Sequence, residues 1–383
     1  MYAARRMKLR PTSSLLLPRI LPAIILRARI LPVMTLPVMA LLAATLLSPA
    51  ASAQAPAAPS PVPPPSIGVI DFFGLNKIQP DRIRRILGFQ EGDPFPRSKA
   101  DVEDHLNTLA GIVESHLEAV CCDAGRPVLY VGVEERGAPH FDLRDAPEGD
   151  MVLPAGIAAA YQDFLAAFAD AARRGVTAED LTHGHSLMAD PTTREIQQRF
   201  PAMAKDHLSE LRDVLHNAAD EDQRAAAAYI IAYAPDKRDI ADDLQFALRD
   251  ADPAVRANAV QGLMALGVYA RLHPSDGLKL ESTWLVEMLH SLSWSDRDHA
   301  LKALQIFTDS PDAQLLGQLR ERALPALVEM SRWKTLQHAL PAFVLTGRIA
   351  GWSEQQIEDA WTRGDRESVI AAALRDPSKK KSR

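Results

Sequence analysis

From residue 155 onward, apolar positions recur at helical spacing and polar turns separate the runs. The first run predicts an amphipathic helix whose buried face carries Ile157, Tyr161, Leu165 and Phe168. Asp190 followed by Pro191 is typical of a helix start, because the carboxylate can cap the helix and proline fits its first position. No alternating strand pattern occurs in this part of the sequence, so residues 155–376 are predicted to be helical.

Three helix pairs in this region repeat one arrangement. The second helix of each pair carries an arginine, an alanine three positions later and a large aliphatic residue seven positions later. These residues are Arg224, Ala227 and Ile231, then Arg256, Ala259 and Leu263, then Arg297, Ala300 and Leu304. The preceding helices have apolar faces formed by Leu208, Leu211 and Leu215, by Ile240, Leu244 and Leu248, and by Leu285, Met288 and Leu289. Such recurrence is typical of an α-solenoid, because one pair cannot bury its own apolar faces and therefore stacks on the next.

The stretch DADPAVRANAVQGLMALG at 250–267 resembles HEAT repeats of the kind named after the phycobilisome lyases, and the resemblance is clearest across 204–308. It implies that the alanine allows close helix packing and that the arginine braces carboxylates in the turns of the stack. Arg256, Asp250 and Asp252 are therefore expected to have structural roles rather than to form a ligand site.

Residues 66–136 show the pattern of a small α/β unit. The stretch SIGVIDFFGL predicts a strand that ends at Gly74. Two helices follow, one starting at Pro80 with Ile83, Ile86 and Leu87 on one face, and one capped by Ser98 with Val102, Leu106 and Leu109 on one face. Two strands joined by a DAG hairpin complete the unit. The first runs from Ile112 to Cys122 and has Val113, Leu117, Ala119 and Cys121 on one side. The second runs from Pro127 to Glu134 and has Leu129, Val131 and Val133 on one side.

This order of elements resembles the POTRA family, as do Gly74 after the first strand and the GDPF motif at 92–95. The resemblance implies a periplasmic module that binds other chains partly by strand addition. The expected fold class is an α+β POTRA-like module at 66–136, a polar linker at 137–154, and an all-α HEAT-like α-solenoid at 155–376.

Residues 1–53 have the features of a secretory signal peptide. They contain seven basic residues and no acidic one, an apolar run at 30–47, and small residues at Ala51 and Ala53, so cleavage is expected before Gln54. An uncleaved membrane anchor is the alternative, because the run is near the lower length limit for a membrane span. The other segments outside the folded parts are a proline-rich spacer at 54–65 and a basic tail at 377–383. The expected location is the periplasm or another exported position in the cell envelope.

Charge narrows the choice of partner. Without the signal segment the chain has 36 basic and 49 acidic residues, a formal charge of −13. Such a chain repels phosphate backbones, which argues against nucleic acid as a partner. A protein or peptide is expected instead, including a membrane-associated partner of the envelope.

The two cysteines of the chain are the neighbours Cys121 and Cys122, so they cannot link distant elements. They can form a vicinal disulfide ring, or lie as two strand residues of which one faces inward and one outward. The second arrangement is the one we expect.

The strongest candidate for chemistry is the stretch EDLTHGHSLMAD, which contains Glu179, Asp180, His183, His185 and Asp190. Two histidines beside carboxylates can hold a metal, but the spacing does not identify a third ligand. We therefore expect capping, turn and packing roles, with Gly184 supplying backbone freedom. Because no familiar catalytic or phosphate-binding motif occurs, no catalytic, cofactor-binding or metal-binding residue is assigned and no cofactor is expected.

These patterns favour an exported, non-catalytic adaptor or scaffold that binds protein partners through the solenoid and the POTRA-like module. The alternative is a metal-dependent enzyme that uses His183 and His185 in a crevice between the two parts.

Overall fold

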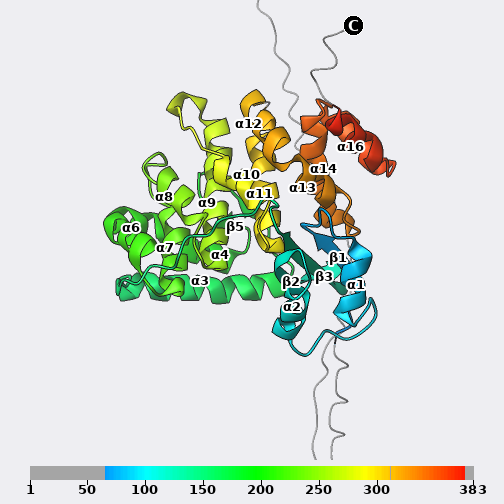
Figure 1. Cartoon of the computed structure of the whole chain (residues 1–383). Helices are drawn as coiled ribbons and strands as arrows, with labels where there is room; N and C mark the ends of the chain where they lie inside the picture. Colours follow the sequence, from blue (N-terminus) through cyan, green and yellow to red (C-terminus); the bar gives the residue numbers. More distant parts are fainter. Residues whose placement is uncertain (1–64, 311, 376–383) are drawn as a thin grey trace, which may run out of the picture. The chain divides into compact units, whose positions relative to one another are not determined.

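The computed structural model describes residues 65–310 and 312–375 (Figure 1), and these residues fall in one compact unit of the chain. The expected signal peptide, the spacer up to residue 64 and the basic tail lie outside the described residues. No helix within the described ranges is long and apolar enough to cross a membrane.

A three-stranded sheet organises the N-terminal region. Its strands are β1 (Val69–Phe73), β2 (Ile112–Asp123) and β3 (Arg126–Glu135), in the order β1-β3-β2. β3 pairs in parallel with β1 and antiparallel with β2. Helices α1 (Pro80–Leu87) and α2 (Lys99–Asn107) share a core with the sheet that includes Ile83, Leu106 and Leu129. The predicted order of strand, helix, helix, strand, strand is confirmed.

Local signals place these helices where the sequence predicts them. Pro80 begins α1, which ends at Gly88, whose φ of 71° lies in the left-handed region that glycine adopts readily. The Ser98 hydroxyl accepts a hydrogen bond from the Asp101 amide at 3.1 Å and thereby caps α2.

The predicted face of β2 is wrong at Val113, which is 51% exposed. The buried residues of this strand are Ile112, Ser115 and Leu117. The register against β3 shifts between Ile112 and Glu114, and such an irregularity moves the residues around it to other faces. Ala119 lies on the same face as Leu117, as predicted, because the two residues pair with Leu129 and Val131 of β3, but it is exposed, and Cys121 near the end of the strand is exposed as well.

Beyond the sheet, the described chain is helical except for one short hairpin that the sequence does not predict. The hairpin consists of β4 (Glu179–Asp180) and β5 (Leu187–Met188). The helices are α3 (Ala155–Arg173), α4 (Pro191–Gln197), α5 (Phe200–Asp206), α6 (Leu208–Asn217), α7 (Glu221–Ile231), α8 (Ala241–Ala247), α9 (Pro253–Leu272), α10 (Thr283–Met288), α11 (Trp294–Phe307), α12 (Ala313–Gln318), α13 (Leu324–Ser331), α14 (Leu336–Ile349), α15 (Glu354–Thr362) and α16 (Arg366–Leu374).

The expected helix pairs are α6 with α7, α8 with α9, and α10 with α11, and each pair is in contact. The three repeated alanines, Ala227, Ala259 and Ala300, are completely buried. The repeated aliphatic residues Ile231, Leu263 and Leu304 are completely buried as well. Small side chains at these positions let neighbouring helices approach closely, so the predicted stacking pattern is confirmed.

The buried face of α3 agrees with the prediction at Ile157 and Tyr161 but differs toward the C-terminal end of the helix. Phe164 is buried and stacks on Tyr229 of α7, with ring centroids 4.5 Å apart. Leu165 and Phe168, which were expected on this face, are 38% and 37% exposed. Several apolar faces fit the same helical spacing, and the contact with α7 decides which one is buried.

The segment 137–154 runs against the helical region. Gly149 forms a parallel bridge with Ala218, and its amide donates to the Asn217 carbonyl at 2.9 Å. The Arg144 guanidinium lies 3.1 Å from the centroid of the Phe246 ring. This segment therefore packs along the ends of α6 and α8 while it connects the sheet to α3.

Candidate functional site

Buried arginines connect successive helix pairs. The guanidinium of Arg224 in α7 donates to both carboxylate oxygens of Asp250, from Nε and Nη2, at 2.9 Å each. Its Nη1 donates to the carbonyl oxygens of Ala218 and Ala219 in the preceding turn, at 2.9 and 2.8 Å. Both charged side chains are buried, so these bonds replace the water that each group has lost.

Arg256 in α9 repeats this arrangement. Its Nε and Nη2 lie 3.0 and 2.9 Å from the carboxylate oxygens of Asp296. Its Nη1 donates to the carbonyl oxygens of Asp250 and Ala251 at 2.8 Å each, and Asp252 caps the first turn of α9. Each arginine thus binds carbonyl groups of its own turn and a carboxylate that follows it along the chain.

The third arginine of the series, Arg297 in α11, has a different environment. Its Nε donates to the Ser291 carbonyl at 2.6 Å, but no carboxylate among the described residues lies within 4.0 Å of the guanidinium. The guanidinium carbon lies 4.4 Å from the centroid of the Phe73 ring, and Nη1 has no hydrogen-bond partner in the described part of the chain. Burial lowers the pKa of Arg297 to about 10. The series of arginine–carboxylate pairs is interrupted where α11 meets β1.

Glu329 in α13 binds backbone amides at this junction. Its carboxylate accepts hydrogen bonds from the amides of Gly74 and Leu75 at 2.8 and 3.2 Å. Burial raises the pKa of Glu329 to about 6, although the Arg297 charge and the two amides act in the opposite direction. Gly74 has a φ of 80°, and a Cβ added there would lie 2.1 Å from the Val133 carbonyl oxygen, so this position requires glycine.

A pocket of about 210 Å³ opens between these groups. Arg297 and Glu329 line it together with His290, whose Nε2 donates to the Arg322 carbonyl at 2.9 Å. The pocket can hold a small polar group between a guanidinium and a carboxylate. Its lining lacks hydroxyl, thiol and amine side chains, which are the groups that most nucleophilic catalysis uses.

Aromatic side chains join the sheet to the helical region next to this pocket. The ring centroid of Tyr130 lies 4.8 Å from that of Trp333 and 5.2 Å from that of Trp294. The Tyr130 hydroxyl lies 2.8 Å from Nδ1 of His338 in α14. Phe73 and Tyr130 belong to the large core of the helical region, whereas the opposite face of the sheet packs on α1 and α2.

Charged groups complete this junction. Glu118 of β2 accepts hydrogen bonds from the amides of Trp294 and Ser295 at 2.9 and 3.3 Å, at the N-terminal turn of α11, where the helix dipole favours a negative charge. Lys334 donates from its amide to the Asp71 carboxylate at 2.6 Å and from Nζ to the Ile70 carbonyl at 3.0 Å. The sheet and the helices therefore hold one another through both apolar and polar contacts.

The predicted histidine cluster lies in the turn between β4 and β5. The ring centroids of His183 and His185 are 6.0 Å apart, and both residues line a pocket of about 410 Å³ with Lys237 and Tyr269. Burial, assisted by the charges of Lys237 and His183, lowers the pKa of His185 to about 4. Every residue that lines this pocket belongs to the helical region, so the histidines do not lie in a crevice between the two parts, as the alternative enzyme hypothesis required.

The carboxylates of the same motif take part in the local fold. Each accepts a hydrogen bond from a residue of the same segment: Glu179 from Ser186, Asp180 from Thr182 and Asp190 from Thr193. Asp190 caps α4 with Pro191 in the first turn, as predicted, and Gly184 has the positive φ that its turn requires. Within 65–310 and 312–375, no group of three or more His, Cys, Asp or Glu side chains is placed to hold a metal.

Sequence reasoning missed Lys237, which is the buried amine of this site. Its side chain packs beside His183 and His185 in the pocket, and the residue is 8% exposed. In the sequence it is an ordinary lysine within a polar turn, PDKRD. Only the folding of the β4–β5 turn onto α7 and α9 encloses it.

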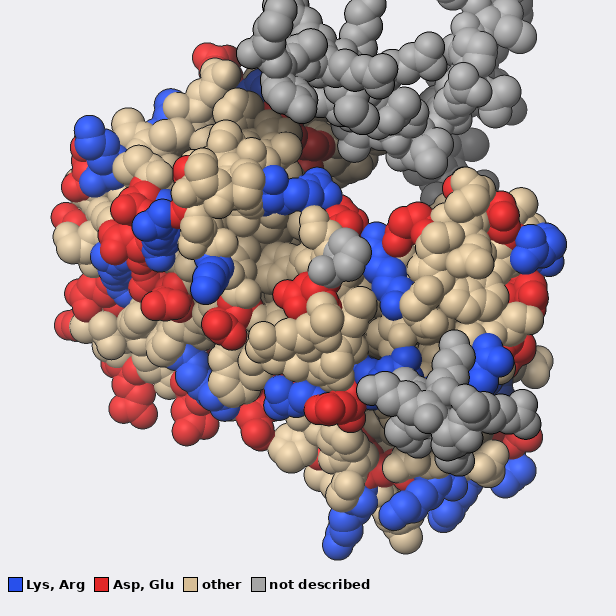
Figure 2. All heavy atoms as spheres, turned by 90° about the horizontal axis from the view of Figure 1, so that it is seen from above, with Lys and Arg blue, Asp and Glu red and all other residues tan. Residues whose placement is uncertain are grey.

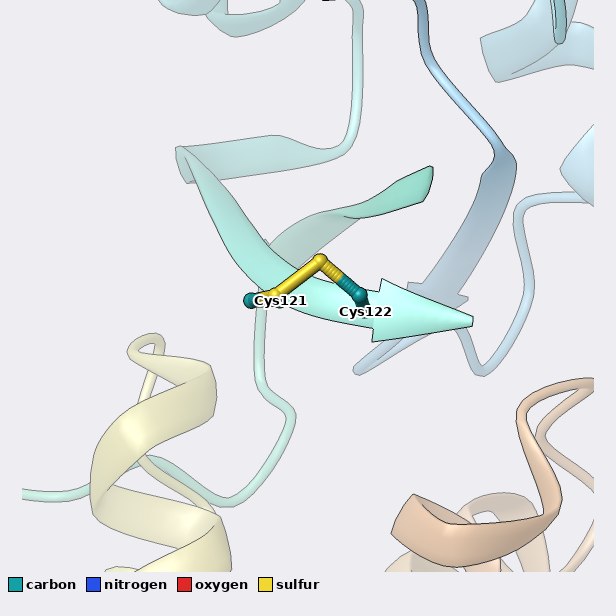
Figure 3. Close-up of a disulfide and its surroundings, with 2 residues drawn as sticks. All are labelled: Cys121 and Cys122. Carbon is teal, nitrogen blue, oxygen red and sulfur yellow. A yellow bond between two sulfur atoms is a disulfide. The ribbon is translucent and has the colours of Figure 1, made fainter. Parts of the chain in front are cut away.

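The two cysteines form a disulfide bond with each other near the end of β2 (Figure 3). The expectation of two unbonded strand residues facing opposite sides is therefore wrong. Cys121 is exposed and Cys122 is partly exposed, so neither side chain serves the core of the sheet.

Residues 208–305 match the family model of HEAT repeats. The matched range begins at the start of α6 and ends within α11, and so includes the three helix pairs and their arginines. No curated protein matches the chain. HEAT repeats generally mediate protein–protein interactions, which supports a scaffold role and a protein partner for this chain.

Proposed function

We propose that this protein is an exported, non-catalytic scaffold that binds a protein or peptide partner in the cell envelope through its helical repeats. The observation that carries the proposal is the HEAT-repeat match over three stacked helix pairs. The polar residues that distinguish these repeats form contacts within the stack: Arg224 and Arg256 form buried ion pairs with Asp250 and Asp296. The repeats therefore resemble a structural framework more than a reaction centre.

Two finer assignments belong to the same proposal. The HEAT repeats are of the phycobilisome-lyase kind, and the sheet region at 66–136 is a POTRA-like module. The strand order β1-β3-β2 with two helices on one face supports the second assignment. The Cys121–Cys122 disulfide supports export, because disulfides persist in oxidising compartments.

The first helices of the pairs offer the surface for the partner. The second helices are covered by the chain itself: α3 packs on α7, Tyr161 of α3 accepts a hydrogen bond from Asn258 of α9 at 2.7 Å, and Glu118 binds the start of α11. On α6 and α8, Asp213 and Asp242 are exposed. Figure 2 shows acidic and basic side chains close together in places on the face seen from above, with uncharged surface between them, so recognition there depends on charge pattern as well as on the net charge.

Export gives the first test. The mature chain is expected to begin at Gln54, because Ala51 and Ala53 occupy the small-residue positions of the cleavage site. N-terminal sequencing of the protein from the envelope fraction checks this result. If the chain retains residues 1–53, this segment is a membrane anchor instead of a signal peptide. If the chain is confined to the cytoplasm, the proposed export is contradicted.

Crosslinking in the native cells tests the binding surface. A photo-crosslinking residue placed at Asp213 or at Asp242 is expected to capture the same partner, and added salt should weaken the capture because the attraction is partly electrostatic. Glu358 of α15 is the matched control, since it is an exposed acidic residue outside the three pairs. Equal capture from all three positions, or none from α6 and α8, would contradict the proposed surface.

A further inference from the structure

Lys237 is a buried amine without a charged partner. Its Nζ donates to the carbonyl oxygen of Ala232, at the C-terminal end of α7, at 2.9 Å. No carboxylate of the described residues lies within 4.0 Å of Nζ. A lysine that is 8% exposed normally pairs with an acid, because burial of an unpaired ammonium is costly.

The amine nevertheless lies where a small molecule can reach it. Lys237 lines the pocket of about 410 Å³ beside Tyr233 and Tyr269. A Cβ added to Gly184 would lie 2.8 Å from Cε of Lys237 and 3.2 Å from the Tyr269 ring, so the glycine packs closely on the lysine stem. The side chain is therefore packed along its stem while it lines the pocket.

The charges around this pocket favour an anionic ligand. No acidic residue lines it, and Lys205 of α5 contributes a second, exposed ammonium. Acidic side chains lie around the pocket rather than in its lining: the Asp180 carboxylate is 3.6 Å from Nδ1 of His183, and Asp236 and Asp276 line the adjoining pocket together with Arg238. Asp276 there accepts a hydrogen bond from the Tyr269 hydroxyl at 2.7 Å.

We propose that Lys237 is a covalent binding site for a small aldehyde or ketone that also carries a carboxylate or phosphate group. The uncharged amine adds to the carbonyl carbon, so that a C–N bond forms and the carbonyl oxygen takes up a proton to give a carbinolamine. The C–O bond then breaks, the oxygen leaves as water, and the nitrogen gives up its second proton. The product is a Schiff base, and the reaction is reversible and needs no oxidant or reductant.

The surroundings of Lys237 favour the addition step. Burial lowers the pKa of Lys237 to about 8, so a substantial fraction of the amine is uncharged near neutral pH. The charged or titratable groups around it are His183 and His185 from the β4–β5 turn with Asp180 beside them, Lys205 from α5, Tyr233 and Tyr269, and Asp236, Arg238 and Asp276 from the adjoining pocket. His185 is neutral at this pH, so its ring adds no further positive charge beside the amine.

Reductive trapping tests the proposal on the full chain as isolated. Glyoxylate, an aldehyde with a carboxylate, is added near pH 7.5 with cyanoborohydride, and the modified lysines are located by peptide mass spectrometry over time. Lys237 is expected to react at least about 10-fold faster than Lys302, whose exposed ammonium pairs with Asp298, because burial leaves part of the Lys237 amine uncharged at this pH. The rate at Lys237 should rise with pH and level off above about pH 8, where the amine has lost its proton. Reaction of Lys237 no faster than that of Lys302 would overturn the proposal, and this comparison needs no variant.

Two substitutions separate the binding site from a purely structural lysine. Lys237→Arg keeps a donor for the Ala232 carbonyl but cannot form a Schiff base, so the fast modification should disappear while the melting temperature stays close to that of the unsubstituted chain. Lys205→Ala should slow the reaction with glyoxylate but not the reaction with neutral propionaldehyde. If Lys205→Ala slows both reactions equally, or slows neither, the site does not recognise an anionic group on the ligand.

Discussion

Replacing Arg256 by alanine is expected to lower the free energy of unfolding by about 3–5 kcal/mol, because the change leaves the Asp296 carboxylate buried without its partner. Asp296 is 2% exposed, and its remaining side-chain hydrogen bond within the described residues comes from the Ser291 hydroxyl at 2.7 Å. Two carbonyl groups of the turn before α9 lose their donor at the same time. Urea denaturation followed by circular dichroism measures this loss.

Arg271→Ala is the matched control for this variant. Arg271 lies on the same helix and pairs with Asp309, but the two side chains are 41% and 34% exposed. Exposed ion pairs contribute little, so this change is expected to cost less than about 1 kcal/mol. Equal losses for Arg256→Ala and Arg271→Ala would show that the buried pair does not hold the helix pairs together. Adding Asp296→Leu to Arg256→Met should cost less than breaking the pair, since both charges are then gone.

Replacing Trp333 by alanine is expected to cost about 3–5 kcal/mol and to loosen the contact between the sheet and the helices. The indole is 1% exposed and packs against Phe73 and Tyr130, and its Nε1 donates to the Phe72 carbonyl at 3.3 Å. Denaturation gives the total loss, and hydrogen exchange locates it. Amide exchange should accelerate most in β1, which loses both an apolar neighbour and a hydrogen bond.

Trp284→Ala provides the comparison for Trp333. Trp284 is only partly buried in α10, where the Arg249 guanidinium stacks on its ring at 4.3 Å. The Trp284 side chain buries less apolar surface than that of Trp333. The expected loss in the free energy of unfolding is therefore less than half of that for Trp333→Ala. If exchange in β1 is unchanged by Trp333→Ala, the aromatic contact does not hold the sheet in place.

The repeats could be predicted because their signal is local and occurs three times. Each arginine, alanine and aliphatic residue lies within two turns of one helix, and the spacing alone predicts a buried face. The C-terminal part of the α3 face was predicted incorrectly for the opposite reason, since contact with Tyr229 of α7 selects Phe164 over Leu165. The bulge near Val113 likewise depends on pairing with another strand.

The junction between the sheet and the helices could not be predicted from the sequence, because its residues are far apart in the chain. Glu329 meets Gly74, and Trp333 meets Phe73, across most of the described sequence. No local pattern connects such residues, and each is unremarkable in its own segment. The same is true of Lys237, because only tertiary packing removes an ordinary turn lysine from water.

The environment of Glu329 limits how this chain can grow by duplication. A unit such as α8 with α9 presents an arginine to the next carboxylate and a carboxylate to the previous arginine, so a copied unit would find matching neighbours on both sides. After α11 this matching stops, because Glu329 binds the amides of Gly74 and Leu75 and Arg297 rests on Phe73. An extra unit inserted there would have to displace the sheet, so the length of the array is fixed on that side by a part of the protein that is not a repeat.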